Sequence, residues 1–207
     1  MKKPIKYFII ALILGISVYN SIYIKDLDVV KAEKSKTVFN AKDYASAFMN
    51  NQVDELVALD ASRFFDGISE NVKNYSEAKG NKLGISNDYY FIIDGNATVL
   101  SVEEENVLIV LHENDKIKLR IATDFIFGNA IREGAQMADI GDFQNTMDYN
   151  NISVELNNIV RETIVPPFKK AVKENDSLYF KGAVKVNTKK PQLNDIRVIP
   201  LILDLKN

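Results

Sequence analysis

Side chains able to do chemistry are limited in kind in this sequence. It contains no cysteine and a single histidine, which excludes thiolate metal sites, cysteine nucleophiles and two-histidine sites within one chain. His112 lies beside Glu113 and is a candidate base, although a lone histidine next to a turn is more often simply solvent-facing. The consecutive acids at 103–105 occupy a turn, where neighbouring side chains do not converge on a cation. We therefore expect no catalytic residue, no metal and no cofactor, and a protein that is not an enzyme.

Cationic residues supply the candidate binding sites. Lys118 and Arg120, with Lys116, lie on the polar face of an alternating segment at 116–121, and Lys185, Lys189 and Lys190 lie near a later loop. Nucleic-acid binding would also require aromatic stacking platforms, and no aromatic residue is interleaved with Lys118 and Arg120. The face is either a ligand surface or a solvated basic strand.

Arg132 and Asp142 form a second candidate pair. They flank an irregular, glycine-containing segment. Their opposite charges predict either a structural ion pair or a grip on an anionic or polyol ligand.

Five strands are predicted to position these residues. Segments 89–102, 107–111, 116–121, 178–186 and 196–205 are rich in β-branched and aromatic residues. Asp94 and Gly95 are typical of a hairpin turn or of a bend in one long strand, and we favour the bent strand. Pro200 cannot donate a ladder hydrogen bond, which predicts an edge or a bulge there.

Helical spacing is found before the strands and between the third and fourth. Asn40 is a candidate N-cap for a helix from residue 41, a second helical stretch is predicted over 53–64, and a third over 69–79 ends at Gly80. Apolar residues from 152 to 164 follow one helical face, and the prolines at 166 and 167 are expected to break or kink that helix.

The order β-β-β-α-β-β favours an α+β protein built on a five-stranded, OB-like antiparallel β-barrel. An open antiparallel sheet with helices on one side is the alternative. Residues 41–207 are expected to form one domain, with a helical cap at 41–80, barrel strands at 88–122 and 178–205, and a helical insertion at 142–174.

The N-terminus predicts membrane attachment. Residues 7–24 carry no charge and follow three lysines, and 18 helical residues span about 27 Å, close to the apolar thickness of a bilayer. We interpret 1–24 as an uncleaved signal anchor, a single transmembrane helix, and 25–40 as a stalk; a cleaved signal peptide is the alternative. The lysines place the following domain on the periplasmic side of the cytoplasmic (inner) membrane.

Charge disfavours nucleic acid as a partner. Residues 25–207 hold 23 basic and 28 acidic residues, and only 165–207, with 9 basic and 4 acidic residues, are net basic. Phosphate affinity depends on cationic contacts, which a net-acidic domain lacks.

Several short motifs carry a resemblance to a known family. FNAKDYA at 39–45, FGNAIR at 127–132, DFQN at 142–145, LYFKG at 178–182 and IRVIP at 196–200 occur in order behind the apolar segment. Together they resemble the bacterial domain-of-unknown-function 2291 family of predicted periplasmic lipoproteins. The resemblance implies an extracytoplasmic, membrane-attached protein with an OB-like barrel, from a family often encoded beside sugar transport systems, and it supplies no catalytic residues. This sequence lacks the lipid-bearing cysteine, so residues 7–24 would themselves be the anchor.

Three functions follow as hypotheses. The first is a non-catalytic accessory or binding module that works with sugar transporter components. The second is an OB-fold binder of oligosaccharide or nucleic acid. The third, a carboxylate-based hydrolase, has no support from residue spacing.

Overall fold

The computed structural model describes residues 39–206, together with Ile5, Tyr7, Leu12, Ile13, Ile16 and Tyr19. The transmembrane helix predicted over 7–24 and the stalk over 25–40 fall mainly outside the described residues, and both stay predictions. Within the described part of the chain, no helix has the length and apolar character needed to cross a membrane. The chain divides into two compact units, Met1–Phe39 and Asn40–Asn207, and the fold described below is that of the second.

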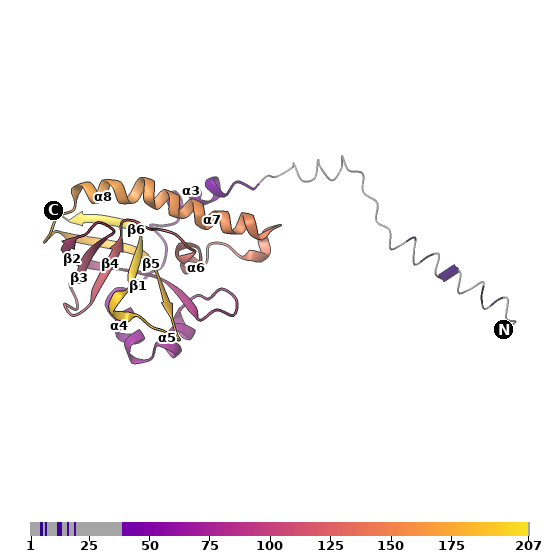
Figure 1. Cartoon of the computed structure of the whole chain (residues 1–207), viewed down its shortest axis with the longest axis horizontal. Coiled ribbons are helices and arrows are strands. Elements are labelled where there is room, and N and C mark those ends of the chain that lie inside the picture. Colours follow the sequence, from indigo (N-terminus) through magenta and orange to yellow (C-terminus); the bar gives the residue numbers. More distant parts are fainter. Residues whose placement is uncertain are drawn as a thin grey trace. The chain divides into compact units, whose positions relative to one another are not determined.

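The strands close into a barrel (Figure 1). Their bounds are β2 Asp88–Val102, β3 Asn106–Leu111, β4 Lys118–Ala122, β5 Ser177–Asn187 and β6 Arg197–Lys206. The sheet order β2-β3-β4-β6-β5 returns to β2, because β2 pairs with β5 over its first eleven residues and with β3 near its end. The predicted five-stranded barrel is confirmed, and β2 runs through Gly95 as one continuous strand.

Two features of the sheet correct the prediction. The barrel is not wholly antiparallel, because β4 and β6 pair in parallel, with Arg120 opposite Arg197. A two-residue strand, β1 Leu59–Asp60, adds to β2 in parallel. The predicted bulge in β6 is present, since Gly182 faces Pro200 whereas Lys181 faces Ile202.

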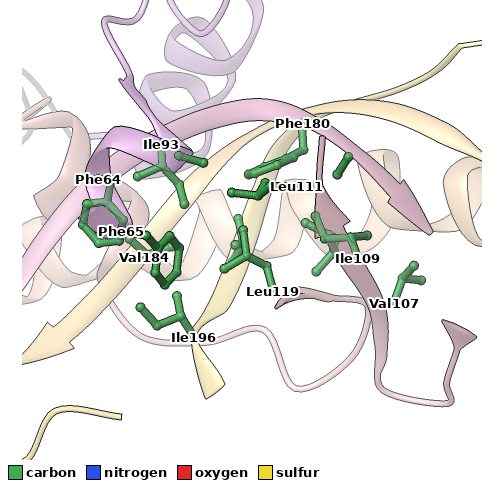
Figure 2. Packing of buried hydrophobic residues seen from close by; sticks show 14 of the residues in the cluster. Phe64, Phe65, Ile93, Val107, Ile109, Leu111, Leu119, Phe180, Val184 and Ile196 are labelled. Atoms are coloured by element: carbon green, nitrogen blue, oxygen red, sulfur yellow. The ribbon is translucent and has the colours of Figure 1, made fainter. Parts of the chain in front are cut away.

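The barrel interior is filled by alternate side chains of the strands. In β3, Val107, Ile109 and Leu111 are buried, and in β4 Leu119 and Ile121 are buried, as a half-exposed strand requires. Figure 2 shows the β3 side chains and Leu119 directed to a common interior with Phe180 and Val184 of β5, and with Phe64 and Phe65 of the helix α4.

Helices cover the barrel on opposite sides (Figure 1). On one side lie α4 Ala61–Glu70 and α5 Val72–Lys79, and on the other α7 Thr146–Ile159 and α8 Val165–Ala171. Both α4 and α8 contribute side chains to the core cluster, among them Phe64 and Phe168. Two further α-helices belong to this unit: α3 Ala41–Asn51, capped by Asn40 as predicted, and the short α6 Ala130–Ala135.

One helix prediction was wrong. Residues 53–64 are not one helical stretch, because β1 intervenes and α4 begins only at Ala61, where the side chain of Asp60 accepts a hydrogen bond from the amide of Arg63. A break or kink was expected at the prolines 166 and 167, and the α-helix is interrupted just before them. A π-helical turn, Val160–Ile164, joins α7 to α8, and the Val165 amide donates to the Val160 carbonyl five residues earlier.

Candidate ligand-binding groove

A short loop between β4 and α6 displays two phenylalanines. In this loop, residues 124–129, Phe125 is 55% exposed and Phe127 is 71% exposed. Between them Ile126 is fully buried and anchors the loop to the domain. Phenylalanine is usually found in protein interiors, so two exposed rings on one short loop suggest a contact surface.

Long side chains from other elements form hydrogen bonds with the backbone carbonyls of the 124–129 loop. Arg197 of β6 donates to the carbonyl of Phe125 at 3.1 Å and also to that of Asp124. Arg161 donates to the Ile126 carbonyl, and Asn157 donates to the Gly128 carbonyl at 2.7 Å. Four of the six loop carbonyls are therefore fixed by groups from β6, α7 and the π-turn, and the two rings are presented on a rigid support.

The loop also stores backbone strain. Phe125 has a φ of 47° and Gly128 a φ of 92°. Glycine adopts such angles readily, but a bulky residue there costs of order 1–3 kcal/mol and needs its surroundings to hold it. Strain of this kind is concentrated at ligand-binding sites, and here it coincides with the exposed ring of Phe125.

A groove of about 600 Å³ lies beside these rings. It is lined by the loop itself, the start of β2, the end of β5, the 188–196 loop and the start of β6. Its polar groups include the side chains of Asp88, Tyr90, Lys185, Asn187, Gln192 and Asp195. The volume is within the range of small-molecule sites, and the 188–196 loop joins the last two barrel strands, a loop that OB-folds use for ligands.

Both acids that line the groove lie close to a cation. Asp88 lies 3.7 Å from Lys185, and Asp195 lies 2.6 Å from Arg120. Burial raises the pKa of the Tyr90 phenol, which a side-chain hydrogen bond with Asn129 partly offsets, so the phenol is neutral at physiological pH. Lys190 and Arg197 also line the groove and form no ion pair among the described residues, so the groove offers amides, a hydroxyl and aromatic rings with a small excess of positive charge.

The predicted basic face is less cationic than the sequence indicated. Lys118 is exposed on β4 and lines a separate cavity of about 340 Å³, as do Lys116 and Asp66. The guanidinium of Arg120 lies between Glu103 at 2.9 Å and Asp195 at 2.6 Å, and the hydrogen bond with Asp195 is the main cause of its raised pKa. Lys118 and Arg120 therefore share a strand face but do not form a free cationic pair.

Arg132 and Asp142 are not brought together as a pair. Arg132 of α6 is 2% exposed and forms its ion pair with Glu133 at 2.7 Å. Its guanidinium also stacks on the ring of Tyr149, 3.6 Å from the centroid, and donates to the Tyr149 carbonyl at 2.6 Å. Asp142 is exposed in a short 3-10 turn, Ile140–Asp142. Asp142 was predicted as the partner of Arg132, but in α6 the adjacent Glu133 supplies the carboxylate that pairs with the Arg132 guanidinium.

Among His112 and the acids at 103–105, the other residues considered for chemistry, two side chains interact with neighbouring residues. The Nε2 atom of His112 lies 2.9 Å from the Thr98 hydroxyl, and Glu103 binds Arg120. Over the described residues, no group of three or more His, Asp or Glu side chains could hold a metal ion.

Sequence reasoning missed the 124–129 loop as a site. Its apolar residues resemble a continuation of β4, and only the glycine at 128 signals a turn. The clamping residues Asn157, Arg161 and Arg197 lie 29 to 73 residues away in sequence, so their convergence depends on the fold.

Comparisons with known proteins agree with this architecture. An OB-fold protein from Thermotoga maritima, known from its crystal structure, superposes with a TM-score of 0.74 at 26% sequence identity, covering 82% of this chain and 100% of that chain. None of the curated proteins compared with the chain matches it. The family described as predicted periplasmic lipoproteins (DUF2291) matches residues 10–204. Since that match covers most of the sequence and the barrel has the expected fold, the chain belongs to the DUF2291 family of predicted periplasmic lipoproteins.

Proposed function

We propose that this protein is a non-catalytic binding module of the cell envelope that holds a saccharide in the groove beside the 124–129 loop. The observation that carries the proposal is the pair of exposed rings, Phe125 and Phe127, on a loop clamped by Arg197, Arg161 and Asn157. A rigid aromatic platform binds without a large ordering cost, and the apolar faces of sugar rings stack on such platforms.

The polar lining of the groove suits a hydroxyl-rich ligand. Its two acids are paired with Lys185 and Arg120, and Arg197 is already engaged with backbone carbonyls. Asn187, Gln192 and the Tyr90 phenol line the groove as hydrogen-bonding groups without charge. Sugar hydroxyls both donate and accept, which suits such a lining.

A polyanion fits the same surface poorly. Nucleic acid binding needs uncompensated lysines or arginines along a track, whereas Arg120 lies between two carboxylates. Residues 25–207 also carry more acids than bases. Nucleic acid is therefore not the proposed partner.

The cellular setting follows from the family and the N-terminal sequence. We infer that residues 7–24 anchor the chain as a single pass in the cytoplasmic membrane with the barrel in the periplasm, in place of a lipid. Components of a sugar transporter are the proposed partners, as the resemblance to the family implies. Affinity purification of the full chain from membranes should recover transporter subunits, and a clean purification without them would reject this partner.

Saccharide binding can be tested on a glycan array with the full chain in detergent micelles. The protein should bind neutral glycans, and the double variant Phe125→Ala/Phe127→Ala should lose at least ten-fold in affinity. Ile85→Ala is the matched control, because Ile85 is fully exposed and does not line the groove. Absence of any neutral glycan binding, or equal loss in the control, would contradict the proposal.

A further inference from the structure

Three cations near the two exposed rings form no ion pair among the described residues. Lys190 and Arg197 line the groove, and Arg161 lines a neighbouring cavity of about 450 Å³. Phe127 lines both spaces. A ligand that stacks on Phe127 therefore lies among cations that have no carboxylate at ion-pair distance.

Arg197 keeps hydrogen-bond donors that the protein does not use. Its guanidinium donates to the side chain of Asn106 at 2.9 Å. It also donates to the carbonyls of Phe125 and Asp124. A guanidinium has five N–H groups, so two of them are left without a partner among the described residues. The oxygens that it binds are neutral acceptors, and they leave its positive charge in place.

Burial makes this unbalanced charge unfavourable. Arg197 is half-buried, and burial lowers the pKa of its guanidinium, although the carboxylates of Glu105 and Asp124 act in the opposite direction. Neither of these acids lines the groove. An anionic group of the ligand would replace the hydration that the guanidinium has lost, and hydrogen bonds between charged partners are stronger than those between neutral ones.

Lys190 adds a second unpaired cation to the groove. It lies just after β5, where the amides of Lys189 and Lys190 both donate to the Oδ1 atom of Asn187, at 3.0 Å and 2.9 Å. These bonds fix the backbone of the turn, while the exposed ammonium of Lys190 has no partner in the described part of the chain. The ammonium of Lys185, in contrast, lies 3.7 Å from Asp88.

From this geometry we infer that the saccharide held by the groove carries one acidic group, which binds Lys190 and Arg197 while the sugar ring stacks on the exposed phenylalanine rings. The inference rests on the proposed saccharide function and names the class of saccharide. A single carboxylate or phosphate matches the small excess of positive charge, whereas the two acids that line the groove disfavour a polyanion. Neutral sugars still bind through the rings and the uncharged polar lining, but less tightly.

The test is an NMR titration of the ¹⁵N-labelled full chain in detergent micelles. The probes are two neutral sugars, glucose and galactose, and their acidic counterparts glucuronate, galacturonate and glucose 6-phosphate. At least one acidic sugar should bind about five-fold more tightly than its neutral counterpart and shift the amides of residues 125–129 and 185–197. Raising the NaCl concentration from about 50 mM to about 500 mM should remove that preference, because salt screens exposed charges.

Lys190→Gln should weaken binding of the acidic sugar about five-fold and leave binding of the neutral sugar unchanged. Lys189→Gln is the matched control, because Lys189 is also exposed and its amide makes the same hydrogen bond to Asn187, but it does not line the groove. Both variants should fold like the wild type by circular dichroism, since neither ammonium has a partner among the described residues. Only Lys190→Gln should lose affinity.

The outcomes separate the two proposals. Equal affinities for the neutral and acidic sugars, or an acidic preference unchanged by Lys190→Gln, would overturn this inference and leave saccharide binding in the groove intact. No shift with any of the five sugars, together with a negative glycan array, would overturn both.

Discussion

Replacing Arg132 by methionine should destabilise the domain strongly, because it leaves the Glu133 carboxylate buried without its cation. The Arg132 and Glu133 side chains are 2% and 10% exposed, and Glu133 would keep only the hydroxyl of Tyr149, at 2.9 Å. Removing one partner of a buried ion pair costs about 3–5 kcal/mol of unfolding free energy. Since small domains are stable by about 5–15 kcal/mol, this is a large fraction of the total.

Arg120→Met is the matched control for this prediction. Arg120 forms ion pairs with two carboxyl groups, but its side chain is 37% exposed. Exposed ion pairs contribute about 0–1 kcal/mol to the free energy of unfolding. The assay is urea unfolding at pH 7 followed by far-ultraviolet circular dichroism. The double variant Arg132→Met/Glu133→Met should recover part of the loss, because both charges are then absent. If Arg132→Met lowers the free energy of unfolding by less than about 1 kcal/mol, or by as much as Arg120→Met does, then burial of the Arg132–Glu133 pair does not determine its contribution.

Three further outcomes are expected. Lys181→Met should lower the free energy of unfolding by at least about 2 kcal/mol and expose residues 52–57 to limited proteolysis, because the buried ammonium donates to the carbonyls of residues 53, 54 and 56 at 3.0–3.1 Å. The control Lys185→Met, at an exposed lysine, should change neither the stability nor the proteolysis. Equal proteolysis of the two variants would count against this role of Lys181. Burial and hydrogen bonds to Glu133 and Asp94 raise the pKa values of Tyr149 and Tyr179 to about 12, so their contribution to stability is complete below pH 10 and is lost as pH rises to 12. Tyr149→Phe should reduce the steepness of that alkaline loss in urea unfolding, and an unchanged pH profile would argue against it. Gly182→Ala should lower the melting temperature, because the added Cβ atom would lie 2.5 Å from the Val198 side chain and 2.6 Å from the Ile199 carbonyl oxygen of β6. A melting temperature equal to that of the wild type would be inconsistent with this packing.

Local chemistry made much of the fold predictable. Alternating apolar residues identified the five barrel strands, Asn40 identified the start of α3, and Pro200 identified the bulge in β6. Each of these depends on residues close in sequence. The parallel pairing of β4 with β6 does not, because it joins segments about 77 residues apart, and β1 is too short for any periodicity.

The candidate site depends more heavily on contacts distant in sequence. Arg120 was correctly placed on a polar strand face, but its neutralisation by Glu103 and Asp195 requires partners 17 and 75 residues away. Phe125 and Phe127 look like strand residues in the sequence, and only the folded chain shows that both rings are exposed and that Phe125 has a φ of 47°. Arg132 was identified as a candidate, and only the position of α6 against α7 shows that its charge is used internally.

The most direct test of the account is the location of a bound sugar. Intermolecular nuclear Overhauser effects should be recorded between a neutral glycan selected on the array and the full chain labelled on its eleven phenylalanines. We expect contacts from the sugar ring protons to the rings of Phe125 and Phe127. Contacts to other phenylalanines only, with none to these two, would contradict it.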